Sequence, residues 1–182
     1  MDHYDYIIVG GGSAGCVAAW RLVSETSARV LVVERGPARA AGLSRFLLPM
    51  PAAWMKGITG SDVVEMHEPV PQKHLNGRRP AVGQANVLGG GTSINAMVYT
   101  RGQHEDYDHW DQFLGGNSGW SFKDVLPHFR NMECNHSFND AYHGVSGPLH
   151  VSETGTKCQV TEDYVLAVQG LGIPYNPDFN GA

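Results

Sequence analysis

A glycine-rich hexapeptide near the N-terminus, GGGSAG at residues 10–15, constrains the fold of this chain more than any other feature. It follows a short apolar run at residues 4–9 and opens a segment, residues 13–25, in which apolar side chains recur near helical spacing. A second apolar run, residues 29–34, comes next. Strand, glycine turn, helix and strand within about 30 residues predict a βαβ unit with a right-handed crossover. We therefore expect an α/β fold with a Rossmann-like core, incomplete in this chain, whose two strands are buried and parallel.

The glycine turn has the spacing of a dinucleotide-binding site. Gly10 allows the tight turn, Gly12 lets a pyrophosphate reach the backbone, and Gly15 allows the helix to pack closely on the strand. The pyrophosphate would lie at the positive end of the helix that begins near Ser13. Glu34 follows Gly15 by nineteen residues and ends the second strand. Its carboxylate can accept hydrogen bonds from a ribose and would repel the 2′-phosphate of NADP.

These residues leave two points open. The pattern could be a plain glycine turn beside a buried acid, although strand, helix and acid in register favour the nucleotide site. The motif by itself does not separate FAD from NAD. Arg35, next to Glu34, could reach a phosphate or face the solvent.

Composition excludes several classes of function. The net charge of −5 argues against nucleic acid or an anionic membrane as the main partner. No stretch approaches 18 uninterrupted apolar residues, which excludes a transmembrane helix. The N-terminus lacks the basic region of a signal peptide. Three widely spaced cysteines fit a reducing cytoplasm and give neither a disulfide framework nor a zinc pattern.

The rest of the chain is less regular. Residues 37–86 contain six prolines and little periodicity, so we expect an excursion that covers a ligand, with short strands near residues 62–68 and 78–82. Residues 133–148 are expected to be loop. Further elements are predicted by periodicity and capping signals: a glycine turn opening a short helix at 88–102, helices at 104–113, 122–132 and 161–171, and a strand at 149–151.

The nine histidines invite a metal site, but their spacing does not support one. His104 and His109 are five residues apart, and His136 and His143 are seven apart, so neither pair has the i, i+4 spacing of a helical metal site. A solvated acidic face is the better interpretation, and we expect no metal. Cys16 is expected to be a small buried hydrophobe on the first helix.

A second glycine-rich segment, ANVLGGGTSINAMVYTRG at residues 85–102, has no role in a plain NAD dehydrogenase. It resembles the first signature of the glucose–methanol–choline (GMC) oxidoreductases, flavoenzymes that oxidise alcohols. The resemblance covers nearly the whole chain, more loosely at residues 37–75. Further matching segments are IIVGGGSAG (7–15), VLVVERG (30–36), DYDHW (106–110), GWSFKDVLPHF (119–129) and YHGVSGPLHVSE (142–153).

The resemblance implies that the chain binds FAD through both glycine segments. The first segment and the acid at the end of the second strand would hold the pyrophosphate and the adenosine ribose. The second would touch the adenine side, pass the phosphates and ribityl chain, and run along the isoalloxazine. The cofactor residues implied in this way are Gly10, Gly12, Ser13, Ala14, Gly15, Glu34, Arg35, Val87, Gly89, Gly90, Gly91, Thr92, Asn95, Ala96, Met97 and Val98.

One departure from the family pattern and one absence bear on the site. Some members tether FAD through a histidine at the position of Ile94, so this chain is expected to bind FAD non-covalently. The family's catalytic histidine lies near the C-terminus of much longer chains, so no catalytic residue is assigned here. His143 either lines the approach to the flavin or forms a structural turn.

The function implied is FAD-dependent oxidation of an alcohol by hydride transfer to flavin N5, and the expected partners are the C-terminal remainder of the enzyme and a small alcohol. The alternatives are an FAD- or ADP-binding fragment without activity of its own and an NAD-binding domain. The expected organisation is a βαβ core (1–36), an FAD-covering segment with the signature (37–153) and the start of an α+β substrate domain (154–182).

Overall fold

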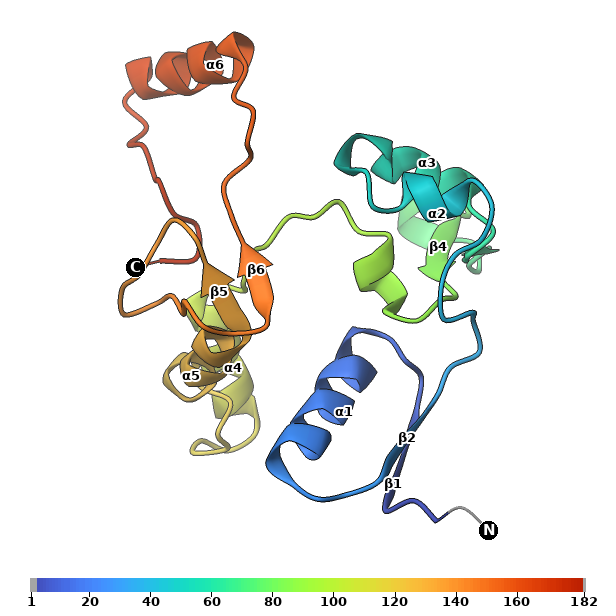
Figure 1. The fold of residues 1–182 in the computed structure, drawn as a ribbon. Coiled ribbons are helices and arrows are strands. Elements are labelled where there is room, and N and C mark those ends of the chain that lie inside the picture. The colour runs from blue at the N-terminus through green and yellow to red at the C-terminus, as the bar shows by residue number, and fades with distance from the viewer. Residues whose placement is uncertain (1–2, 182) are drawn as a thin grey trace. The chain divides into compact units, whose positions relative to one another are not determined.

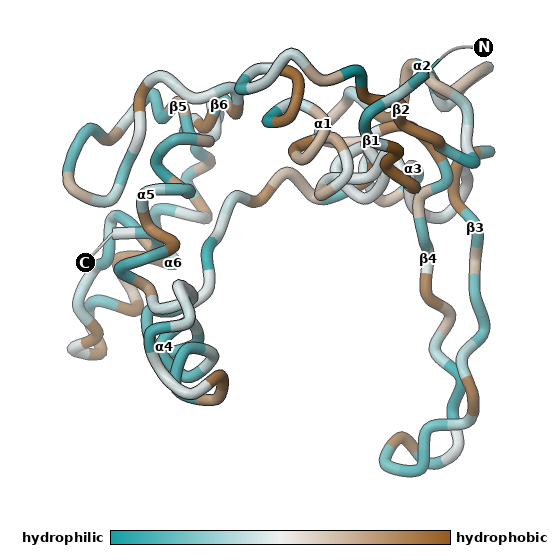
Figure 2. The backbone as a smooth tube through the Cα atoms, turned by 90° about the horizontal axis from the view of Figure 1, so that it is seen from below, coloured by the Kyte–Doolittle hydropathy of each residue, from teal (hydrophilic) through white to brown (hydrophobic). Residues whose placement is uncertain are grey.

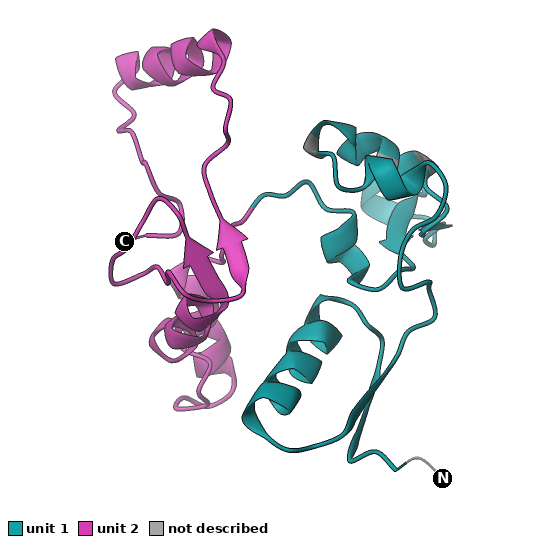
Figure 3. Ribbon diagram, in the orientation of Figure 1, with its two compact units in different colours: residues 1–98 teal, residues 99–182 magenta. Residues whose placement is uncertain are grey.

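The computed structural model describes residues 3–181, apart from the side chains of residues 51, 57, 58 and 60. The chain divides into two compact units, Met1–Val98 and Tyr99–Ala182 (Figure 3). The two units are defined by packing, whereas the three domains expected from the sequence are defined by their roles in an enzyme. Those three domains stay predictions. None of the helices in the described residues is long and apolar enough to cross a membrane.

Unit 1 begins with the predicted βαβ unit (Figure 1). Strand β1 (Tyr6–Val9) leads through the glycine turn into α1 (Ser13–Glu25), and β2 (Val30–Val33) returns parallel to β1. Gly10 has a φ of 97°, a conformation that favours glycine. A Cβ atom on Gly15 would lie 2.0 Å from the Gly10 carbonyl oxygen, so only glycine allows this packing of helix on strand.

The expected burial of these two strands is wrong. They are among the most hydrophobic segments of the chain (Figure 2), yet Ile7 is 63% exposed and Val9 is 86% exposed. The reason is that β1 and β2 form a two-stranded sheet by themselves among the described residues. A parallel sheet is normally covered on both faces. The apolar pattern therefore identified the strands correctly, but not their surroundings in this chain.

The rest of unit 1 contains more structure than expected. Helices α2 (Ser44–Leu47) and α3 (Trp54–Gly60) were missed, because each is too short for a helical period to show. Strand β3 (Val64–His67) confirms the first predicted strand and pairs antiparallel with β4 (Val82–Ala85). The second strand was therefore predicted about a strand length too early. The short helix expected after the glycine turn is a single 3₁₀ turn, η3 (Gly90–Ser93).

Unit 2 confirms the later helices. They are α4 (His104–Phe113), α5 (Phe122–Met132) and α6 (Gln159–Gly170). The Ser121 hydroxyl accepts a hydrogen bond from the Asp124 amide, as a capping residue of α5 should. Strand β6 (Leu149–Val151) is confirmed, but its parallel partner β5 (Glu133–Asn135) lies in a segment expected to be loop. The polar sequence of β5, Glu-Cys-Asn, gives no strand signal.

Candidate functional site

The two glycine segments of unit 1 meet at the N-terminal end of α1. The Gly89 amide donates a hydrogen bond of 2.7 Å to the Gly11 carbonyl oxygen. A Cβ atom on Gly90 would lie 2.8 Å from the Gly12 Cα atom, closer than real Cβ contacts allow. Gly89 and Gly90 also have positive φ values of 95° and 55°. Glycine at both segments is therefore what lets these two loops touch.

The first turn of α1 is open to an anion. Gly12 is the N-cap residue and offers no side chain to the helix amides. The first amides of a helix need an acceptor from elsewhere, and the helix dipole favours one with negative charge. Ser13, Ala14 and Gly15 form this first turn. Their placement fits the pyrophosphate role that the sequence predicted for them.

Glu34 is held in place by the backbone on both sides. Its carboxylate accepts hydrogen bonds from the Gly36 amide at 2.8 Å and from the Gly11 amide at 2.6 Å. These bonds, with that from Gly36 the stronger influence, hold the pKa of Glu34 below its ordinary value. The carboxylate is therefore ionised and fixed beside the glycine turn, and its oxygens have lone pairs left for hydroxyl donors.

A cavity of about 470 Å³ lies beside Glu34 and the glycine turns. Its walls come from the ends of β1, β2 and β4 and from η3. Glycine backbone on one side and a fixed carboxylate on the other suit a nucleotide, which needs close approach for phosphates and acceptors for ribose. Six of the predicted cofactor residues line this cavity: Gly10, Gly12, Glu34, Arg35, Gly90 and Gly91.

Four predicted residues line a second cavity of about 490 Å³ in unit 1: Val87, Thr92, Asn95 and Met97. The Asn95 side-chain oxygen, Oδ1, accepts a hydrogen bond from the Met97 amide, and Met97 has a φ of 60°. A non-glycine residue in this conformation is unusual and occurs often at binding sites. Three other predicted residues of this segment, Gly89, Ala96 and Val98, line neither cavity, and Ala96 and Val98 are exposed.

Arg35 contacts other side chains of unit 1. Its guanidinium donates to the Asn86 side chain at 3.0 Å and forms an ion pair with Glu65. The Arg35 side chain is also 65% exposed, so it largely faces the solvent, one of the two alternatives that the sequence left open, and a phosphate contact stays a prediction. An anion in the neighbouring cavity would have to compete with Glu65 for the guanidinium.

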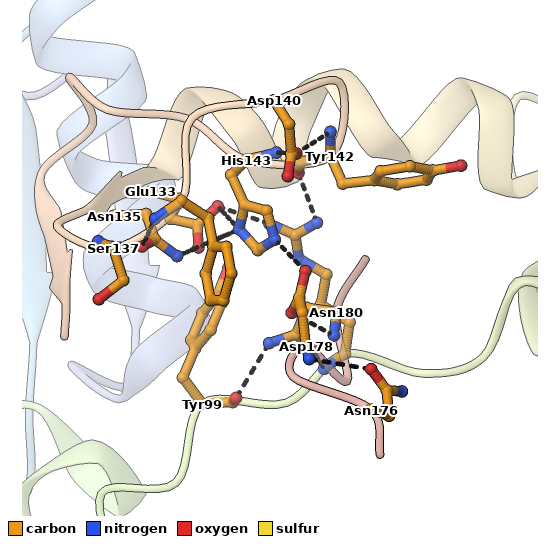
Figure 4. A network of polar contacts seen from close by, with 12 residues as sticks. Tyr99, Glu133, Asn135, Ser137, Asp140, Tyr142, His143, Asn176, Asp178 and Asn180 are labelled. Carbon is orange, nitrogen blue, oxygen red and sulfur yellow. Dashed lines mark hydrogen bonds and ion pairs between the residues drawn. The ribbon is translucent and has the colours of Figure 1, made fainter. Parts of the chain in front are cut away.

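Unit 2 contains a buried polar network that the sequence did not reveal (Figure 4). Glu133 of β5 is fully buried and lies 2.7 Å from the Arg101 guanidinium, which is 3% exposed. His143 lies between two carboxylates: Nδ1 is 3.0 Å from Glu133, and Nε2 is 2.8 Å from Asp178. Asn135 also donates to Glu133. Arg101 and His143 thus face the carboxylates of Glu133 and Asp178 within unit 2.

The network shifts the pKa values of its members. Burial alone would raise the pKa of Glu133, but hydrogen bonds from Asn135, His143 and the Gly144 amide, together with the Arg101 charge, hold it below its ordinary value. Burial alone would lower the pKa of His143, but hydrogen bonds and charge from Glu133 and Asp178 raise it. Both ring nitrogens face carboxylates, so the doubly protonated imidazolium fits this site best.

This arrangement predicts a loss of stability as the pH rises above 6.5. The pKa of His143 is raised above 6.5, so its stabilisation is complete below pH 6.5 and is lost as pH rises through the folded-state value. Glu133 stays ionised over this range because its pKa is lowered. As the pH rises from 6.5 through the folded-state pKa of His143, we expect the urea midpoint to fall. The fall should be smaller in the His143→Gln variant. Substitution of the exposed His128 by glutamine should leave the fall unchanged; an equal fall in all three proteins would contradict the assignment.

The sequence pattern of the GMC oxidoreductase family matches residues 4–182, and the chain belongs to this family. Two similar relatives are oxygen-dependent choline dehydrogenase of Sinorhizobium fredii (38% identity) and alcohol dehydrogenase [acceptor] of Pseudomonas putida (39% identity). Each alignment covers 98% of this chain but only 31% and 32% of the relative. The chain therefore spans about a third of the length of the curated relatives it matches.

A solved FAD-dependent oxidoreductase from Chaetomium thermophilum has the same fold. Its TM-score to this chain is 0.80 at 31% identity, with 98% of this chain and 31% of that chain covered. The expected family and the α/β fold class are confirmed by these matches. The roles of the individual cofactor residues stay predictions, which the geometry of unit 1 supports to different degrees.

Proposed function

We propose that this chain is the FAD-binding part of an enzyme that oxidises an alcohol. The observation that carries the proposal is the meeting of the two glycine segments beside the fixed carboxylate of Glu34. When bound, the flavin supplies a hydride acceptor at N5. The chain itself contributes binding: amides of α1 for the pyrophosphate, Glu34 for the ribose hydroxyls, and residues 95–98 for the ring system. The similarity to a choline dehydrogenase and an alcohol dehydrogenase supports an alcohol as the substrate.

The proposal includes a non-covalent cofactor and a second part of the enzyme. Ile94 has no group that could form a bond to the flavin, which supports reversible binding. The general base that takes the hydroxyl proton is assigned to a histidine outside this chain. The exposed apolar strands β1 and β2 and the greater length of the relatives support such a second part. The three free cysteines support a reducing, cytoplasmic setting.

Anaerobic reduction of the flavin tests this function. Acid precipitation of the purified intact protein should leave all flavin in the supernatant, identified as FAD by mass. Addition of choline or benzyl alcohol without oxygen should bleach the flavin absorbance, and the aldehyde should form in equal amount. Residues 1–182 expressed alone should give no turnover. Absence of FAD would refute the cofactor assignment, and FAD that no alcohol reduces would leave only a nucleotide-binding role.

A further inference from the structure

The two-stranded sheet of unit 2 places different chemistry on its two faces. Glu133 and Asn135 are buried in the polar network, so the residue between them, Cys134, lies on the opposite face of β5. His136 lies two residues beyond Cys134, and its amide donates to Val151 of β6, which continues the pairing of the strands. In the register of the sheet, His150 is the direct partner of Cys134. Strand geometry therefore gathers one thiol and two imidazoles on one face.

The ligand atoms of these three residues lie close together. All lie within 4.8 Å of one another, and the His136 Nε2 and His150 Nδ1 atoms are 3.0 Å apart. In a tetrahedral zinc site, bond lengths of about 2.0–2.3 Å place neighbouring ligand atoms roughly 3.3–3.6 Å apart. Small side-chain rotations would bring this trio to that geometry. Both histidines are exposed, so a cation has access from solvent.

We propose that Cys134, His136 and His150 form a binding site for Zn²⁺, with a fourth position for water. Thiolate sulfur and imidazole nitrogen are the ligands that zinc prefers, and three protein ligands with one open position is a common zinc arrangement. The Cys134 thiol, which donates to the Val145 carbonyl oxygen, would lose its proton to solvent as the sulfur–zinc bond forms. Zinc would tie β5 to β6 across the sheet.

A hydrogen-bonded histidine pair is the competing interpretation. The two rings are nearly parallel, 17° apart, and the short distance between their nitrogens also fits a shared proton. That interpretation does not involve the Cys134 thiol, whose hydrogen bond to the Val145 carbonyl oxygen would then be its only contact of this kind among the described residues. Spacing along the sequence missed the trio because His136 was compared with His143, whereas the sheet brings His150 beside it.

Zinc titration of the intact, tag-free protein against a chromophoric chelator tests the site. We expect one equivalent of zinc to bind. His136→Ala and His150→Ala should each weaken zinc binding at least about 10-fold, because loss of a residue that only hydrogen-bonds to a metal ligand already costs that much. The matched control is His109→Ala, which removes an exposed imidazole from α4.

The absorption spectrum of bound Co²⁺ distinguishes a metal ligand from a residue with a purely structural role. Bound Co²⁺ should show thiolate-to-metal charge transfer in the near ultraviolet, and Cys134→Ser should abolish it. Circular dichroism shows whether each variant is folded. If His150→Ala does not fold, His150→Gln provides a second test of the same ligand. Binding of equal affinity in the original protein and in the folded His136→Ala/His150→Gln variant, or no stoichiometric binding at all, would overturn the proposal.

Discussion

Substitution of Glu133 by glutamine is expected to lower the free energy of unfolding by about 3–5 kcal/mol, the usual cost of removing one partner from a buried ion pair. The amide has the same shape but no charge. It would leave the cations of Arg101 and His143, 3% and 1% exposed, without the carboxylate that lies between them. Arg101 would keep its hydrogen bond to the Tyr142 carbonyl oxygen, but its buried Nε atom already has no hydrogen-bond partner among the described residues, so losing the Glu133 carboxylate leaves the guanidinium poorly compensated.

Urea denaturation followed by far-ultraviolet circular dichroism measures this loss. The matched control is Glu153→Gln, which removes an exposed carboxylate that pairs with Lys157 four residues away. This control should leave the urea midpoint nearly unchanged, because exposed ion pairs contribute little. Equal midpoints for both variants would show that the Glu133 carboxylate is not buried among cations in solution.

The βαβ unit was predictable because all its signals are local. The apolar runs, the spacing of Gly10, Gly12 and Gly15, and the acid at residue 34 lie within one short stretch of chain. Each signal reports backbone conformation directly. The exposure of Val9 was not predictable in the same way, since burial depends on which other strands cover the sheet.

The polar network was not predictable because its members are far apart along the chain. His143 is 10 residues from Glu133 and 35 residues from Asp178. Nothing in a polar loop indicates that three such residues come together, and β5 itself has no apolar period. The family-like segment at residues 142–153 was the one available signal, and it left open whether His143 serves the flavin or a turn. The structure places His143 in a network within unit 2.

Gly90→Ala is expected to weaken FAD binding by about 2–4 kcal/mol, on the order of 30–1000-fold, from overpacking plus the cost of a positive φ in alanine. The added Cβ would lie 2.8 Å from the Gly12 Cα atom, and backbone cannot give way as a flexible side chain can. The two glycine segments must then separate, which moves the amides of one away from the carboxylate and helix end of the other. The proposed pyrophosphate site requires both at once.

Quenching of FAD fluorescence on titration into the intact apoprotein measures the affinity. The matched control is Gly155→Ala in unit 2, where a Cβ atom meets open space and φ is not positive. It makes the same chemical change without the contact, so its FAD affinity should equal that of the original protein. If Gly90→Ala also binds FAD with the original affinity, the approach of Gly90 to Gly12 does not shape the cofactor site. Weakened binding in Gly90→Ala alone would instead mean that the two glycine segments, 70 residues or more apart in the sequence, act as one binding surface.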